Sequence, residues 1–61
     1  MPANLKVYIV VVDSIDGTES GHIDHVFYRE DDAQSRKTEC NDYFTGAGMK
    51  QYAYVSVRNV F

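Results

Sequence analysis

Two groups of side chains in this sequence are of the types that occur in active sites. Cys40 is the single cysteine, and His22, Asp24 and His25 lie close together along the chain. A thiolate nucleophile requires a base within hydrogen-bond reach and an electropositive setting. Acidic residues surround Cys40 instead, and no third residue can be named to orient His25. We therefore interpret Cys40 as a buried structural cysteine.

The histidines and aspartates have the chemistry of metal ligands but not the spacing. Residues three apart on a strand point to opposite faces, so the rings of His22 and His25 cannot converge without a bulge. Residues 13–17 (Asp-Ser-Ile-Asp-Gly) lack the alternating ligands and closing glutamate of a calcium loop. Residues 46–48 (Gly-Ala-Gly) lack the setting of a phosphate loop. We expect no metal, no cofactor and no enzymatic activity.

Three segments are predicted to be strands. Residues 5–12 and 22–28 are rich in β-branched and aromatic residues, and residues 51–61 alternate between apolar and polar types. Residues 13–21 carry aspartate, serine and glycine, which favour turns, so the first two strands should form a hairpin with an acidic tip.

Residues 30–44 are predicted to be a helix. Three acids in its first turn complement the helix dipole, Asp31 and Gln34 resemble a capping box, and Gly46 is placed to end the helix. The apolar stripe is thin: it comprises Ala33, Cys40 and Phe44, with the aliphatic stems of Arg36 or Lys37 between them.

The element order predicts a single α+β domain over residues 1–61 with ββαβ topology. A right-handed crossover through the helix gives a three-stranded antiparallel sheet in the order 2-1-3, with the helix packed on one face. The first strand is the most apolar on both of its faces, which favours the central position.

Strand parity predicts which side chains the helix covers. The mostly aliphatic set is expected beneath the helix: Leu5, Val7, Ile9, Val11, Ile23, Phe27, Ala53, Val55 and Val57. The opposite face is expected to carry Lys6, Tyr8, Val10, Val12, Asp24, Val26, Tyr28, Tyr52, Tyr54, Ser56 and Arg58. Four of the five tyrosines fall on that uncovered side.

An uncovered tyrosine-rich face predicts an interaction surface, since tyrosine combines apolar area with a hydroxyl that tolerates water. The predicted homodimer or second-contact residues are Tyr8, Val10, Val12, Val26, Tyr28, Tyr52, Tyr54 and Arg58. Three alternatives stay open. The tyrosines could simply half-shield a solvated sheet, or, flanked by Lys6 and Arg58, they could stack the bases of a single-stranded nucleic acid. The protein could also be a purely structural module, in which the tyrosine face closes a homodimer and binds nothing else.

The charges are distributed unevenly. The net charge is −3, and all nine acids lie between Asp13 and Asp42. Such asymmetry steers partners of opposite charge, here a protein with a basic surface, although it would also serve solubility alone. The predicted partner-binding residues are Asp13, Asp16, Glu19, Glu30, Asp31, Asp32, Glu39 and Asp42.

Residues 5–12 (Leu-Lys-Val-Tyr-Ile-Val-Val-Val) and 26–33 (Val-Phe-Tyr-Arg-Glu-Asp-Asp-Ala) resemble segments of small proteins common in phages and other mobile elements. The resemblance implies a compact accessory protein that binds and modulates a host protein, such as an inhibitor of a nucleic-acid-handling or host-defence enzyme. It carries over no functional residue.

The location expected from the sequence is the cytoplasm, or the host cytoplasm if the protein is phage-encoded. Residues 1–4 show neither the basic nor the apolar region of a signal peptide. The longest apolar run, residues 7–12, is far shorter than the roughly 20 residues that span a bilayer.

Overall fold

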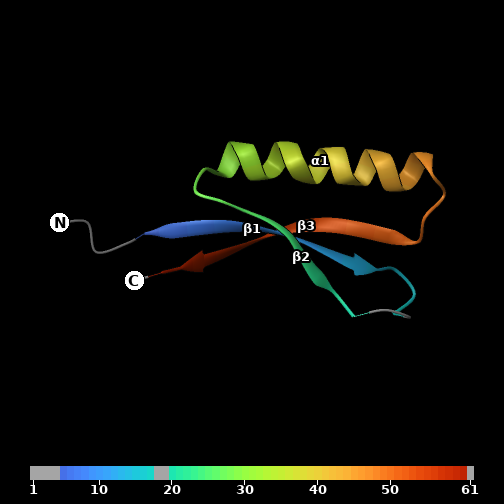
Figure 1. Ribbon diagram of the computed structural model, residues 1–61, viewed down its shortest axis with the longest axis horizontal. Helices are drawn as coiled ribbons and strands as arrows, with labels where there is room; N and C mark the ends of the chain where they lie inside the picture. The colour runs from blue at the N-terminus through green and yellow to red at the C-terminus, as the bar shows by residue number, and fades with distance from the viewer. Residues whose placement is uncertain (1–4, 18–19, 61) are drawn as a thin grey trace.

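The computed structural model describes residues 5–17 and 20–60, which form three strands and one helix (Figure 1). In chain order these are β1 (Lys6–Ser14), β2 (His22–Phe27), α1 (Glu30–Gly46) and β3 (Gln51–Asn59). Their order is the predicted ββαβ, and the ends of β1 and α1 each lie two residues beyond the predicted ones. Within the described residues, no helix has both the length and the apolar character needed to cross a membrane.

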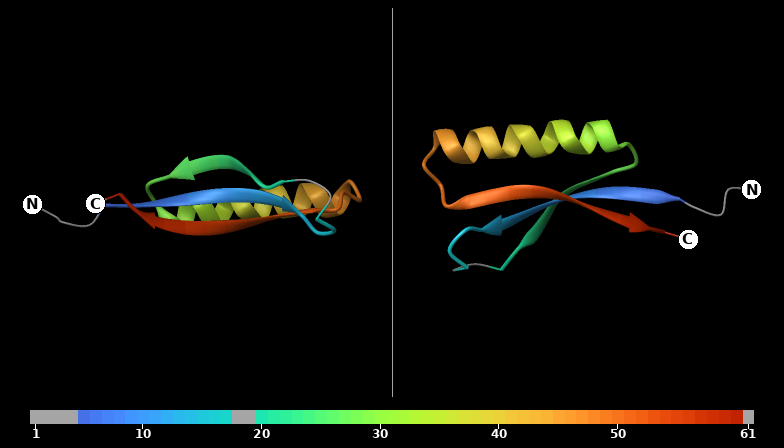
Figure 2. Two further views of the ribbon diagram at one scale, coloured as in Figure 1. Left: turned by 90° about the horizontal axis from the view of Figure 1, so that it is seen from below. Right: turned by 180° about the vertical axis from the view of Figure 1, so that it is seen from behind.

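β1 is the central strand of the sheet. It pairs antiparallel with β2 on one edge and with β3 on the other, which gives the order β2-β1-β3 and confirms the predicted fold. The helix covers one face of this sheet, and a view from below shows the strands lying in front of α1 (Figure 2). The arrangement therefore has two layers, the helix and the sheet. Because the central strand β1 is apolar on both of its faces, one apolar face points away from the helix.

The core lies between α1 and the sheet and is built from small side chains. The buried core residues are Val10, Val12, Ala33, Cys40 and Ala53. Val10 is fully buried, and Phe44 packs against the cluster from the helix. The thin helix stripe predicted from the sequence is thus the one that contacts the sheet.

The start of α1 differs from the prediction. Arg29 is the N-cap residue, and no side chain caps the helix. Asp31 lies inside the first turn, where its carboxylate oxygens accept hydrogen bonds from the Arg29 guanidinium at 3.1 and 2.9 Å. The predicted capping box of Asp31 and Gln34 was wrong, because Asp31 is not the N-cap residue and its carboxylate accepts hydrogen bonds from the Arg29 guanidinium and from the N–H of Asp32.

The end of α1 depends on a different glycine from the one predicted. Gly46 is the last helical residue, whereas Gly48 has a positive φ of 69°. The N–H of Gly48 donates to the carbonyl of Thr45, and the N–H of Met49 donates to that of Phe44. This pair of bonds is a Schellman motif, which requires the left-handed conformation that glycine adopts at least cost.

Asn41 ties the helix to the outer edge of β3. Its side-chain oxygen accepts a hydrogen bond from the N–H of Ala53 at 2.8 Å, and its amide nitrogen donates to the carbonyl of Ala53 at 3.1 Å. An edge strand otherwise presents such groups to solvent or to another chain. The amide of Asn41 therefore continues the hydrogen-bond ladder at an edge where residues 5–17 and 20–60 provide no fourth strand.

Candidate functional site

The candidate site is the face of the sheet that α1 leaves uncovered, which we call the open face. Residues paired directly across antiparallel strands point to the same side, and the buried Val10 and Val12 mark the side of the helix. The register then assigns the apolar residues of the open face as Val7, Ile9, Val11, Ile23, Val26, Tyr52 and Tyr54. Asp13, Ser56 and Arg58 are polar residues on the same side.

The open face is strongly apolar. Ile23 and Val26 on β2 are 62% and 51% exposed, and Tyr52 and Tyr54 on β3 are each 40% exposed. The two tyrosine rings stack with their centroids 5.9 Å apart. Between these rows, the aliphatic side chains of β1 are half-buried by their neighbours. Exposed apolar side chains gathered on one side of a small protein are typical of a contact surface.

The structure corrects the predicted faces of β1. Tyr8, Val10 and Val12, expected in the uncovered interface, lie on the helix side, where Val10 and Val12 belong to the core and Tyr8 packs against it. Conversely, the aliphatic side chains expected beneath the helix at 7, 9 and 11 lie on the open face. The register with β3 decides this, because Val10 pairs with Val55 and Val12 pairs with Ala53.

A bulge changes the faces of β2 as well. The register shifts between Val10 and Val11, so that Val10 pairs with His25 whereas Val11 pairs with Ile23, which leaves Asp24 as the extra residue. Ile23, expected beneath the helix, therefore lies on the open face. Asp24, expected on the open face, points to the helix.

Four of the other predicted interface residues lie on the expected face of the sheet. Val26, Tyr52, Tyr54 and Arg58 lie on the open face by register. Tyr28 follows β2 and is strongly exposed. The open face therefore has fewer tyrosines and more aliphatic residues than expected.

The acidic residues do not form one surface. Glu30, Asp31 and Asp32 occupy the first turn of α1, whereas the turn that follows β1 lies on the other side of the sheet, toward the last turn of the helix (Figure 1). Glu39 and Asp42 are exposed further along the helix. Asp13 lies on the open face, and the predicted Glu19 lies outside the described residues. The helix acids and the tip are thus separate features.

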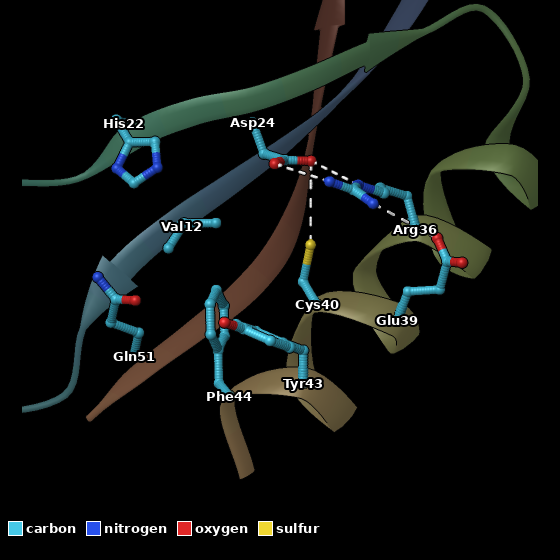
Figure 3. Close-up of a pocket in the computed structure, with 9 residues that line it drawn as sticks. All are labelled: Val12, His22, Asp24, Arg36, Glu39, Cys40, Tyr43, Phe44 and Gln51. Carbon is cyan, nitrogen blue, oxygen red and sulfur yellow. Dashed lines mark hydrogen bonds and ion pairs between the residues drawn. The ribbon is translucent and has the colours of Figure 1, made fainter. Parts of the chain in front are cut away.

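A pocket lies between the second half of α1 and the start of β2 (Figure 3). The volume of this pocket is about 410 Å³. Within it, the carboxylate of Asp24 accepts two hydrogen bonds of 2.8 and 3.2 Å from the guanidinium of Arg36. The hydrogen bonds from Arg36 lower the pKa of Asp24. Glu39 lies 3.6 Å from the same guanidinium.

Cys40 lines this pocket beneath Asp24, with its Sγ 3.9 Å from a carboxylate oxygen (Figure 3). The thiol is buried, and burial raises its pKa, with the Asp24 charge adding to the effect. A thiol with a raised pKa is a poor nucleophile at neutral pH. His25, the base considered from the sequence, stacks on Phe27 with ring centroids 4.9 Å apart.

The bulge at Asp24 also affects the metal ligands considered above. It places His22 and His25, which pair with Val12 and Val10, on the same side of β2. The carboxylate of Asp24, which lies between them in the sequence, binds Arg36, so the Arg36 guanidinium occupies the position that a metal ion would take beside this carboxylate. In the part of the chain that the structure describes, no three histidine, cysteine, aspartate or glutamate side chains are grouped to hold a metal ion.

The fold and the open face define the class of this protein: a small two-layer ββαβ protein with an apolar sheet face. Comparison with protein-family models, with curated proteins and with solved structures found no match.

Proposed function

We propose that this chain is a non-enzymatic binding protein that acts by occupying the surface of another protein. The observation that carries the proposal is the open face, where two aliphatic residues and two tyrosines are at least 40% exposed on one side of a sheet. Interfaces favour tyrosine and aliphatic side chains at their centres. A chain with so small a core gains from covering such a face.

The outer surface of α1 supplies the second part of the proposal, which is electrostatic steering. Glu30, Asp32 and Asp42 are exposed on the helix, and its last turn has no basic residue. We propose that this surface approaches a basic surface of the partner, since complementary charge accelerates association. From the resemblance of residues 5–12 and 26–33 to phage proteins, the proposed partner is a host protein that handles nucleic acid or acts in defence.

The pocket supports a binding role over catalysis. Its carboxylate is neutralised by a bidentate guanidinium, and its thiol has a raised pKa. Activated nucleophiles and general bases require the reverse shifts, a lowered thiol pKa or a raised carboxyl pKa. The Asp24–Arg36 pair is therefore proposed to be structural.

Single-stranded nucleic acid is the alternative ligand for the open face. The stacked rings of Tyr52 and Tyr54 favour it, because bases stack on exposed aromatic side chains. Of the two cations expected beside them, however, only Arg58 shares their side, since Lys6 lies on the side of Tyr8. Nucleic-acid binding through this face would have little phosphate contact to depend on.

The test compares two charge reversals that change the net charge equally. Immobilised wild type, Asp31→Lys/Asp32→Lys and Asp16→Lys/Glu19→Lys are exposed to lysate of candidate host cells, and retained proteins are identified. We expect the helix variant to lose specific basic proteins that the hairpin variant retains. Equal retention by all three would overturn the proposed role of the helix, and salt-sensitive retention of single-stranded nucleic acid would favour the alternative.

A further inference from the structure

We propose that the open face is covered by a second copy of this chain, packed face to face with its strands antiparallel, so that Arg58 of one copy meets Asp13 of the other. This inference rests on the proposed role of the open face as a contact surface. It commits that face to one occupant and to one relative orientation.

The charges of the open face favour a copy of itself. Within the described strands, the face carries one cation, Arg58, and one anion, Asp13, around an apolar centre. Arg58 pairs across the sheet with Val7, whereas Asp13 pairs with Tyr52 at the other end of β1. Six residues of strand separate the two positions, about 20 Å at ~3.3 Å per residue. They cannot meet within one copy, but they are complementary between two.

Symmetry then selects one orientation. A two-fold axis in the interface and perpendicular to β1 lays each Arg58 end over the Asp13 end of the other copy, and it brings β3 over β3. Arg58 then also lies above the ring of Tyr52, a favourable place for a cation. A two-fold axis along β1 would bring the two Arg58 ends together instead, which like-charge repulsion opposes.

The two charged side chains are accessible for this role. Asp13 is held in place, because its Oδ1 accepts a hydrogen bond of 2.8 Å from the N–H of Ser14. A side chain at Gly21 would approach the carboxyl carbon of Asp13 within 3.3 Å, so glycine leaves the space that this carboxylate occupies. Arg58 is exposed, and among the described residues it takes part in none of the salt bridges.

The size of the face suits a small dimer. Three strands about 4.8 Å apart and up to 30 Å long give a sheet area of roughly 400 Å² per copy. Two copies would bury on the order of 800 Å², which is below the size of standard stable interfaces and corresponds to a weak dimer. Such an interface would give the aliphatic row at 7, 9 and 11 a second layer.

Long-range repulsion does not oppose the arrangement. The net charge is −3, but five of the nine acids lie on α1, on the far side of each sheet. Face-to-face packing places the helices outermost, roughly 30 Å apart with layers of about 10 Å. That spacing exceeds the Debye length of about 8 Å at physiological salt. Each acidic helix surface stays exposed for a different partner.

The test is a charge exchange measured by sedimentation equilibrium on purified protein. Arg58→Asp and Asp13→Arg alone each place like charges together twice per dimer, so each is expected to weaken self-association about tenfold or more. Mixed in equal amounts, the two variants form opposite-charge pairs, and dimerisation is expected to return. Lys6→Asp and Asp42→Arg are the controls, because they make the same changes of charge away from the open face, on the helix side of β1 and on α1, and they should dimerise like wild type.

Each other outcome contradicts the inference in a different way. A monomeric wild type at millimolar concentration overturns it, while the lysate experiment tests the helix surface separately. A wild-type dimer that Tyr54→Glu leaves intact would place the interface elsewhere. A dimer that Tyr54→Glu breaks but charge exchange does not restore would overturn the orientation. Circular dichroism checks that each variant folds. If Asp13→Arg does not fold, Asp13→Asn, which keeps the side-chain shape, is used instead: alone it removes both ion pairs, and mixed with Arg58→Asp it restores one of them.

Discussion

At the residue scale, the ion pair of Asp24 with Arg36 is the main polar contact between β2 and the helix. β2 is a short edge strand, and the bulge turns the Asp24 carboxylate toward the helix. The carboxylate is largely buried and makes two hydrogen bonds with the guanidinium. This contact aligns the two elements that line the pocket.

The Asp24 carboxylate should make stability depend on pH. Arg36 lowers the pKa of Asp24 in the folded protein below its ordinary value of 3.8, so folding favours the ionised form. The stabilisation is complete above that ordinary value and is lost as pH falls through the folded value. Asp24→Asn should cost about 1–2 kcal/mol of unfolding free energy at pH 7.

Urea denaturation of wild type and Asp24→Asn at pH 7 and at pH 2–3 measures this effect. The difference between the two proteins should shrink in acid, whereas the exposed control Asp42→Asn should follow wild type closely at both pH values. A difference that is the same at both pH values would show that the Asp24 charge does not stabilise the fold.

The position of Asp24 could not be predicted from the sequence. Strict alternation along residues 22–28 places it on the face opposite to Phe27, and only the bulge brings it to the side of the helix. The segment contains no glycine to indicate a bulge. Its one signal is an aspartate inside a strand, which needs a partner such as Arg36 when it is buried.

At the element scale, two glycine-to-alanine substitutions at the end of α1 are expected to change stability in opposite directions. Gly48 has a positive φ, so Gly48→Ala should destabilise the protein by about 1 kcal/mol. Gly46 is helical with open space around its Cα, so Gly46→Ala should stabilise it by roughly 0.5–1 kcal/mol. Thermal unfolding of the two variants tests this, and a loss of stability in both would contradict the assigned termination.

The Asn41 amide should contribute to stability through the backbone of β3. Asn41→Ala leaves the N–H and carbonyl of Ala53 without this partner and should cost about 1–2 kcal/mol. Ser35→Ala, a substitution at an exposed position on the same helix, should change the free energy of unfolding by only a few tenths of a kcal/mol. Chemical denaturation compares them, and equal effects would mean that the tie to β3 contributes nothing.

The elements and their order followed from the sequence, but the faces of β1 did not. Residues 7–12 are apolar at every position, so either parity could face the helix. The choice depends on the pairing of Val10 with Val55 and of Val12 with Ala53, which is a long-range property. In β3 a polar alternation was present, and there the predicted faces at 52, 54, 56 and 58 agree with the register.

At the scale of the whole molecule, the fold leaves one face of the sheet without a covering layer. The helix covers one side of the sheet, and the other side carries the open face (Figures 1 and 2). A second copy over that face would create four layers with the acidic helices outermost. The dimer would then present two identical acidic surfaces, and a partner with two basic sites would bind it more tightly than a monomer.

The bivalent arrangement gives a prediction at this scale. The proteins retained in the lysate experiment, once purified, should bind wild type more tightly than Tyr54→Glu if they have two basic sites, and equally if they have one. Titration calorimetry at concentrations where wild type is dimeric measures both affinities. Equal affinity for a two-site partner would contradict simultaneous use of both helices.

The central claim is that a second copy of the chain covers the open face, and molar mass by light scattering tests it most directly. One chain has a mass of 7.0 kDa. We expect about twice that mass for wild type and for Tyr43→Glu, which alters an exposed tyrosine on the helix, and the single-chain mass for Tyr54→Glu. The single-chain mass for all three proteins, at every concentration up to the millimolar range, would contradict the claim.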